Sequence, residues 1–173
     1  MELAKHKITP CLWFDGEAED AAKFYVSIFK NSKLGNISRY GKEGFEIHGR
    51  KEGTVMVAEW EIAGQKFVGL NGGPQFKFSE AISFQISCEN QEEVDYFWSR
   101  LTAGGGQESM CGWLKDRFGL SWQVVPTALF EMLQDRDAAK AQRVTKAFLQ
   151  MRKFDIAALR RAFEGKELVG AKQ

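Results

Sequence analysis

The side chains best suited to chemistry in this sequence of 173 residues are three cysteines, two histidines and one strand carboxylate. Cys11 would be a nucleophile only beside a base or a cation that forms its thiolate, and the predicted neighbouring strands offer amides and hydroxyls instead. Cys88 and Cys111 lie far from it, so neither a disulfide framework nor a CxxC zinc site is indicated. The cysteines are interpreted as reduced, structural thiols.

Glu59 is the one carboxylate that strand alternation would direct at the open face of a sheet. Burial there would suit it to act as a general base, and a solvated edge position is the alternative. His6 and His48 stand near the terminus and beside Gly49 in a polar loop, where surface positions are expected. Glu59 is thus the single candidate for a catalytic residue.

Strand alternation also predicts which residues share the face away from the helices. They comprise one large aromatic side chain, a thiol, hydroxyls and neutral amides: Thr9, Cys11, Trp13, Gly69, Asn71, Ser83, Gln85, Ser87, Ser121 and Gln123. An apolar wall with a few orienting polar groups is typical of a small-molecule cleft. The alternative is that these groups hydrogen-bond one another across the interior. The predicted ligand-binding residues are Cys11, Trp13, Asn71, Ser83, Gln85 and Gln123.

Two glycine runs, 70–74 and 104–106, do not predict a nucleotide site, because neither opens a helix with its amides. Binding of S-adenosylmethionine in a parallel sheet requires a strand, a glycine loop and an acidic residue further along the chain. The sequence does not show this arrangement. No cofactor is therefore predicted.

The elements that position these residues follow one pattern twice. In the first copy, a strand over 8–14 leads through Asp15-Gly16 into a helix over 17–30, and period-two alternation then predicts a hairpin of strands at 55–62 and 66–71. Each copy is interpreted as a βαβββ module, a four-stranded sheet with its helix on one face.

The second copy has a strand over 81–88 and a helix capped by Asn90, with Glu93 three residues on. Strands over 111–115 and 120–125 are joined by the turn Asp116-Arg117-Phe118-Gly119. The distances from Phe14 to Phe24 and from Ser87 to Phe97 match, which favours a duplication. Phe84, Ile86, Trp122, Val124 and Trp60 fall on the helix side and are predicted core residues.

Pro126 ends the last strand, and helices are predicted over 127–134, 137–151 and 155–163. Their apolar stripes would pack against the sheets or a second subunit. The fold class is α+β, a single domain over 1–173 with module one at about 7–75, module two at about 80–126 and C-terminal helices at 127–165.

The composition, 44% apolar and 27% charged, is that of a globular chain, and no apolar run reaches the length of a membrane span. No secretory signal pattern follows the basic start, so a cytoplasmic location is expected. The net charge of +1 gives no field to gather nucleic acid. Basic residues exceed acidic ones after Asp135, and this excess is interpreted as a solvated helix surface. The expected partner is a small molecule, without nucleic acid or membrane.

Four stretches, CLWFDGEAEDAAKFY, GLNGGPQFKFSEAISFQIS, CGWLKDRFGLSWQVVP and MRKFDIAALRRAFEG, carry a resemblance to a known family. The chain resembles the PhnB-like family, also labelled 3-demethylubiquinone-9 3-methyltransferase domains. That family lies within the vicinal oxygen chelate superfamily of glyoxalases, bleomycin-resistance proteins and dioxygenases. The resemblance implies two modules of the kind predicted above.

The superfamily resemblance also implies four metal-binding positions, one from the first and last strand of each module. In this sequence they fall on Thr9 or Pro10, Gly69, Ser83 and Gln123. None is His, Asp or Glu, and neutral amide or hydroxyl oxygens bind transition metals weakly. No metal site is therefore predicted.

The predicted function is metal-independent binding of a small molecule, as the resemblance to bleomycin-resistance proteins implies. The alternative is an enzyme of the superfamily: a metal-dependent lyase or dioxygenase using Glu59 with His48, or the labelled methyltransferase. Members of the superfamily commonly pair, so a homodimer is expected, with the C-terminal helices contributing contacts.

Overall fold

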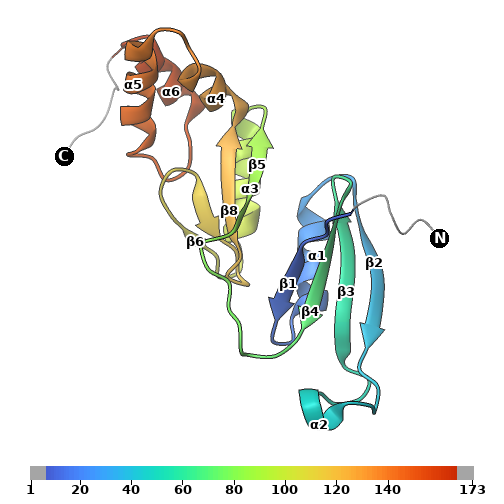
Figure 1. Ribbon diagram of the computed structural model, residues 1–173. Helices are drawn as coiled ribbons and strands as arrows, with labels where there is room; N and C mark the ends of the chain where they lie inside the picture. The colour runs from blue at the N-terminus through green and yellow to red at the C-terminus, as the bar shows by residue number, and fades with distance from the viewer. Residues whose placement is uncertain (1–6, 167–173) are drawn as a thin grey trace. The chain divides into compact units, whose positions relative to one another are not determined.

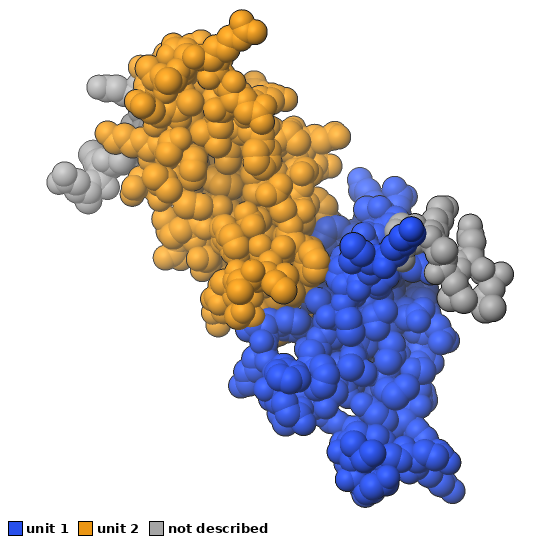
Figure 2. Space-filling model, viewed as in Figure 1, with its two compact units in different colours: residues 1–78 blue, residues 79–173 orange. Residues whose placement is uncertain are grey.

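The computed structural model describes residues 7–166. The chain divides into two compact units, residues 1–78 and 79–173 (Figure 2). Each unit is built around its own four-stranded sheet. No helix within the described residues has the length and apolarity to cross a membrane.

The first unit follows the predicted βαβββ order, with a short additional helix (Figure 1). Its elements are β1 (Cys11–Phe14), α1 (Ala18–Ile28), β2 (Ser32–Arg39), α2 (Phe45–His48), β3 (Val55–Ile62) and β4 (Gln65–Asn71). The strand order is β1-β4-β3-β2, in which β1 runs parallel to β4 and the other pairs are antiparallel. Helix α1 covers one face of this sheet.

The second unit repeats the same connections. Its elements are β5 (Ser83–Cys88), α3 (Gln91–Thr102), β6 (Gln107–Glu108), β7 (Trp113–Lys115) and β8 (Ser121–Pro126). The order β5-β8-β7-β6 has a parallel β5–β8 pair, which corresponds to β1–β4. Asn90 caps α3, since its side chain accepts a hydrogen bond from Glu93 N at 2.9 Å. The predicted pair of βαβββ modules is confirmed.

Aromatic side chains fill the space between sheet and helix in the first unit. The rings of Trp60 and Phe67 stack with centroids 5.6 Å apart, and Tyr25 of α1 lies 5.7 Å from Trp60. Gly69 makes room for this packing, because a side chain there would come within 3.0 Å of Ala18 and Trp60. A small residue in β4 therefore lets α1 approach the sheet closely.

The second sheet packs against α3 through Val94, Trp98 and Leu101. Of the five predicted core residues, four are buried, namely Trp60, Ile86, Trp122 and Val124. Phe84 is half-buried, with its ring 5.6 Å from that of Trp122. Burial of these large rings supplies much of the apolar area that stabilises each unit.

The three predicted C-terminal helices are present as α4 (Thr127–Leu133), α5 (Ala138–Phe148) and α6 (Ile156–Phe163). Asp137 and Asp155 cap the last two with their side chains. Their apolar stripes pack around one another and the end of β8, with Val125, Leu129, Met132, Val144, Phe154 and Leu159 in one buried cluster. The apolar stripes of the helices therefore pack within the second unit.

The matched spacing of ten residues does not align equivalent positions. Phe14 is buried on the helix side of its sheet, whereas Ser87 is exposed on the opposite side. In the parallel pair β1–β4 the last paired residues are Phe14 and Asn71, and in β5–β8 they are Cys88 and Pro126. Phe14 therefore corresponds to Cys88. The connection from strand to helix is one residue longer in the first unit, which shifts the apparent repeat.

Candidate functional site

The face of the second sheet that points away from α3 carries polar side chains. Five of them come from β5 and β8: Ser83, Gln85, Ser87, Ser121 and Gln123. Their orientation follows from alternation, because Trp122 and Val124 are buried on the α3 side. Gln123 Nε2 donates a hydrogen bond to Ser83 Oγ at 2.9 Å. The predicted common face is therefore present in this unit.

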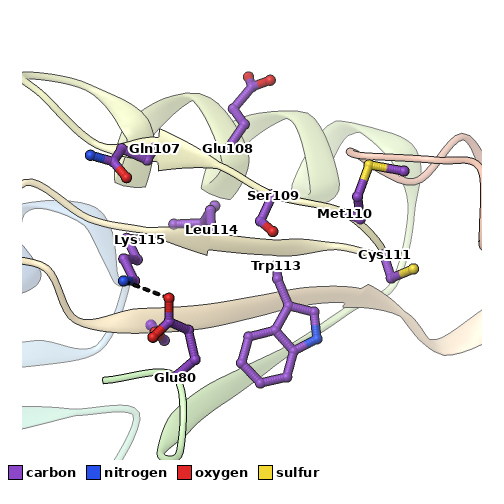
Figure 3. A pocket seen from close by; sticks show the side chains of 10 residues that line it. Glu80, Gln107, Glu108, Ser109, Met110, Cys111, Trp113, Leu114 and Lys115 are labelled. Atoms are coloured by element: carbon purple, nitrogen blue, oxygen red, sulfur yellow. Dashed lines mark ion pairs between the residues drawn. The ribbon is translucent and has the colours of Figure 1, made fainter. Parts of the chain in front are cut away.

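A cleft of about 530 Å³ lies beside these residues, at the β7 side of the same unit (Figure 3). It is lined by Glu80, Gln107, Glu108, Ser109, Met110, Cys111, Trp113, Leu114, Lys115 and Ser121. Figure 3 shows Trp113 and Glu80 projecting to the same side of the strands, while Glu108 points the other way. Glu108 is used elsewhere, since its Oε1 accepts a hydrogen bond from Trp98 Nε1 of α3 at 2.7 Å.

One ion pair lies in the cleft. Lys115 Nζ is 2.6 Å from Glu80 Oε1, with 32% of the lysine side chain and 65% of the glutamate side chain exposed. The hydrogen bond from Lys115 holds the pKa of the Glu80 carboxyl below its ordinary value. Lys115 belongs to β7, whereas Glu80 precedes β5 and lies outside the strands. The backbone of Lys115 is therefore anchored in the sheet, whereas that of Glu80 is not.

Two further polar groups in the cleft lack partners. Ser121 is 1% exposed, and its Oγ has no hydrogen-bond partner in the part of the chain that the structure describes. Trp113 Nε1 likewise donates to no described residue, whereas the indoles of Trp13 and Trp98 each donate to an oxygen. Buried polar groups in native structures are normally hydrogen-bonded, so the Ser121 hydroxyl beneath the cleft is a hydrogen-bonding group that no described residue uses.

The first unit presents Cys11 and Trp13 on the face away from α1, as predicted. The Trp13 indole lies over Gly72, where any side chain would collide with it, and donates from Nε1 to Gly73 O at 2.7 Å. Phe76 meets the same ring edge-on, with centroids 4.9 Å apart. The glycines of the 70–74 run therefore leave space for the Trp13 indole.

Asn71 and Gly69 were expected on the open face, and the structure places both on the helix side. Asn71 is 3% exposed. Its Oδ1 accepts from Ala18 N at 2.9 Å, and its Nδ2 donates to Val55 O at 3.0 Å. The amide thus holds the start of α1 against the sheet, and a ligand cannot use it without displacing backbone groups.

The register also moves one of the four metal-binding positions that the resemblance implied. Counted from the last parallel pair of each sheet, the residue of β4 that corresponds to Gln123 is Val68, one residue before Gly69. Thr9 corresponds to Ser83 by the same count. Hydroxyl, methyl and amide groups thus occupy the four positions, and they do not fit a divalent transition metal.

The surroundings of Glu59 and His48, the alternative metal donors, do not favour a metal site either. Glu59 lies on the open face of β3, as alternation predicted, but is exposed, so the burial that would suit a general base is not found. His48 uses both ring nitrogens locally, Nδ1 with Arg50 N at 2.9 Å and Nε2 with Glu43 O at 3.2 Å. Within residues 7–166, no three His, Cys, Asp or Glu side chains are grouped to hold a metal. His6 lies outside the described residues.

Two of the cysteine thiols, those of Cys11 and Cys88, are held protonated. Desolvation raises the pKa of the Cys11 thiol even though the residue is exposed overall, and burial raises the pKa of the Cys88 thiol to about 12. Because the thiolate is the reactive form, neither is an activated nucleophile. This agrees with the structural role expected for them.

Known proteins resemble this chain over most of its length. The sequence model of the 3-demethylubiquinone-9 3-methyltransferase family matches residues 6–125. The chain belongs to this family. The solved structure of a PhnB protein from Bacillus cereus is 36% identical with a TM-score of 0.62, over 70% of this chain and 100% of that one.

More distant structures share the fold of this PhnB-like chain. PA1353 from Pseudomonas aeruginosa is 18% identical with a TM-score of 0.55, over 70% of this chain and 97% of that one. The fosfomycin resistance protein FosX from Listeria monocytogenes, solved with Mn(II) and sulfate, is 15% identical with a TM-score of 0.51, over 75% and 96%. The fold is that of the vicinal oxygen chelate proteins. No curated protein matches significantly.

The PhnB-like match ends at residue 125, before α4 begins, so the C-terminal helices lie outside it. The connection between α5 and α6 nevertheless holds the backbone beside the cleft. Cys111 N donates to Met151 O and Gly112 N to Arg152 O, both at 2.7 Å. Cys111 is held at a φ of 57°, in the left-handed region that is unusual for a residue other than glycine.

Sequence reasoning found Ser121 but missed the β7 side of the site, notably Trp113 and Lys115. The signal was present, because the DRFG turn fixes the pairing of β7 with β8. Lys115 pairs directly with Ser121, and Trp113 with Gln123, so both share the predicted open face. Ser83, Gln85 and Gln123 lie on this face but do not line the cleft itself.

Proposed function

We propose that this PhnB-like chain is a metal-independent small-molecule-binding protein whose ligand occupies the cleft on the open face of the second sheet. The observation that carries the proposal is the cleft itself, at which the buried Ser121 hydroxyl has no partner among the described residues. Its volume of about 530 Å³ lies within the range of small-ligand pockets. In this proposal a substrate-binding role of Ser83, Gln85 and Gln123 requires a ligand that extends beyond the cleft along the same face. A binding role of Cys11 and Trp13 belongs to a separate surface on the first unit.

Independence from metal rests on the chemistry of the side chains at the four superfamily positions. FosX shows that a protein of this fold can carry Mn(II). Ser83 and Gln123 offer only neutral oxygens and an amide nitrogen, and they hydrogen-bond each other. Neutral donors do not offset the hydration that a divalent ion loses, so a resident ion is not expected.

The experiment that tests this function has a metal arm and a ligand arm. Protein purified without chelator is analysed for metal content and then titrated with Mn²⁺, Zn²⁺ and Mg²⁺ while its thermal unfolding is followed. Substoichiometric metal and an unchanged midpoint are expected, and one tightly bound ion per chain would overturn the proposal. A compound library is screened in parallel, with S-adenosylmethionine included because the family description names a methyltransferase.

Hits from the screen are tested against the variant Trp113→Leu. Loss of binding in this variant, with retention in the matched variant Trp13→Leu of the other unit, places the ligand in the cleft. Binding that is lost only in Trp13→Leu would instead assign it to the first unit. Binding of S-adenosylmethionine would favour the methyl transfer that the family description names.

We also propose that the chain acts in the cytoplasm as a homodimer. The support is that Phe130 and Leu149 of the C-terminal helices remain exposed after the helices have packed. Large apolar side chains that stay exposed are often covered at subunit contacts. Light scattering at micromolar concentration should give twice the chain mass of 19.6 kDa, and a monomer mass would contradict it.

A further inference from the structure

We infer that the cleft takes an aromatic carboxylate, whose ring lies against Trp113 and whose anionic group replaces Glu80 as the partner of Lys115. This inference rests on the proposed function and names its ligand class. It follows from three features of the cleft: the balance of donors and acceptors, the unequal anchoring of the ion pair, and the apolar walls.

Five of the side chains that face the cleft can donate hydrogen bonds, whereas Glu80 can only accept them. Lys115 and Trp113 can only donate, and Ser109, Ser121 and Gln107 can both donate and accept. Glu80 is the one carboxylate that faces the cleft among the described lining residues, because Glu108 is bonded to Trp98 on the helix side. A ligand that complements this surface must carry acceptors, and a carboxylate carries the most for its size.

The Glu80 carboxylate of this ion pair can be displaced by another anion. Lys115 is a strand residue opposite Ser121, and about a third of its side chain is exposed. Glu80 lies on the connection before β5 and is 65% exposed. Exposed ion pairs contribute little to stability, so an incoming carboxylate can separate this pair at small cost. The lysine charge then remains neutralised in the bound state.

The walls favour a planar apolar body. Trp113 is half-buried with its ring projecting into the cleft, and Met110 is 43% exposed at the same site. Indole faces and thioether sulfur both contact aromatic rings favourably. Ser121, buried and without a described partner, can donate to an oxygen of the ligand or to a water beneath it.

The test uses three probes that share one ring system and differ in charge: 2-naphthoate, 2-naphthamide and 2-naphthylmethylammonium. Binding to the full-length chain is measured by calorimetry and by quenching of tryptophan fluorescence. Naphthoate should bind tightest, with the amide at least about tenfold weaker and the cation weaker still. Trp113→Leu should weaken naphthoate and naphthamide alike.

The two members of the ion pair should respond in opposite directions. Lys115→Met should weaken naphthoate about tenfold or more and leave naphthamide nearly unchanged. Glu80→Gln should strengthen naphthoate about two- to fivefold, because it removes the competing carboxylate. A purely structural role of the pair would make both variants change binding in the same direction.

The matched control is the Lys153–Asp95 ion pair, which joins α3 to the segment before α6 and lines no part of the cleft. Lys153→Met should leave all three affinities unchanged, and circular dichroism confirms that each variant is folded. Equal binding of the three probes, no binding of naphthoate, or weaker binding in Glu80→Gln would each overturn the inference. The proposed function is overturned separately, by stoichiometric metal in the purified protein.

Discussion

Gln123 of β8 donates a hydrogen bond from Nε2 to Ser83 Oγ of the neighbouring strand β5, over 2.9 Å. These are the two positions of the second module at which the superfamily resemblance implies metal donors. In this chain the two side chains satisfy each other and leave no strong donor for an ion. Their ends are nevertheless close enough that stronger metal donors at the same places would meet.

The double variant Ser83→His with Gln123→Glu should therefore acquire a zinc site. One imidazole and one carboxylate on adjacent strands are expected to bind Zn²⁺ weakly, so 1 mM Zn²⁺ should raise the free energy of unfolding by about 1 to 3 kcal/mol. Thermal unfolding with and without Zn²⁺ measures it. The wild type and the matched variant Ser83→Ala with Gln123→Ala should show no shift, and an equal shift in all three would contradict the argument.

The residues of the second sheet illustrate what the sequence could predict. Alternation in β5 and in the first four residues of β8 placed Ser83, Ser121 and Gln123 on the correct face, because polar and apolar residues alternate there. In β4 the apolar run Phe67 to Leu70 has no such alternation. A shift of one residue then reverses the face of every side chain, which is why Asn71 was misplaced.

The cleft was harder to predict because its end depends on contacts distant in sequence. Cys111 and Gly112 depart from the regular strand, and their amides pair with Met151 and Arg152 of the C-terminal segment. No local pattern in residues 107–115 indicates this pairing. Lys115 and Trp113 could have been placed from the DRFG turn, whereas the path of the backbone at Cys111 and Gly112 depends on the connection between α5 and α6.

Asp116 should be a strong stability determinant of the second unit, because its buried carboxylate organises the turn before β8. Its Oδ1 accepts from Phe118 N and Leu120 N, and Oδ2 accepts from Trp122 Nε1 at 2.8 Å. Asp116→Ala should lower the free energy of unfolding by about 3 kcal/mol, since it leaves buried donors unpaired. Asp116→Asn keeps one acceptor oxygen and should lose about 1 to 2 kcal/mol. Urea unfolding measures both, and equal losses would argue against the carboxylate.

Gly112 should tolerate no side chain. Its φ is 78°, and an added Cβ would lie 2.4 Å from the Phe154 ring and 2.8 Å from Val124 O. Gly112→Ala should therefore destabilise the chain by about 3 kcal/mol or more, combining backbone strain with overpacking.

Gly119 provides the matched control, because its φ is 85° and an added Cβ would meet nothing within 4 Å. Gly119→Ala introduces backbone strain but no steric clash, so the free energy of unfolding should fall by about 1 kcal/mol. Thermal and urea unfolding of the two variants compare them directly. Similar losses would mean that the Phe154 contact does not constrain the backbone at Gly112.

Cys88 should make the stability of the chain decline at alkaline pH. Burial raises the pKa of its thiol from an ordinary 9.0 to about 12 in the folded chain. Between these values the unfolded chain releases the proton while the folded chain retains it. The free energy of unfolding should therefore be unaffected below about pH 9 and fall by about 1.4 kcal/mol for each pH unit above it, until the folded thiol also ionises.

The measurement is urea unfolding of the wild type and of Cys88→Ala from pH 8 to pH 11. Lysine and tyrosine side chains also titrate in this range, but they are common to both proteins, so the difference between the two curves isolates the thiol. The variant should be less stable at pH 8, because it loses a buried sulfur, and should approach the wild type as the pH rises. Parallel curves would show that the folded thiol ionises at its ordinary pKa, and the interior beneath α3 would then have to admit water.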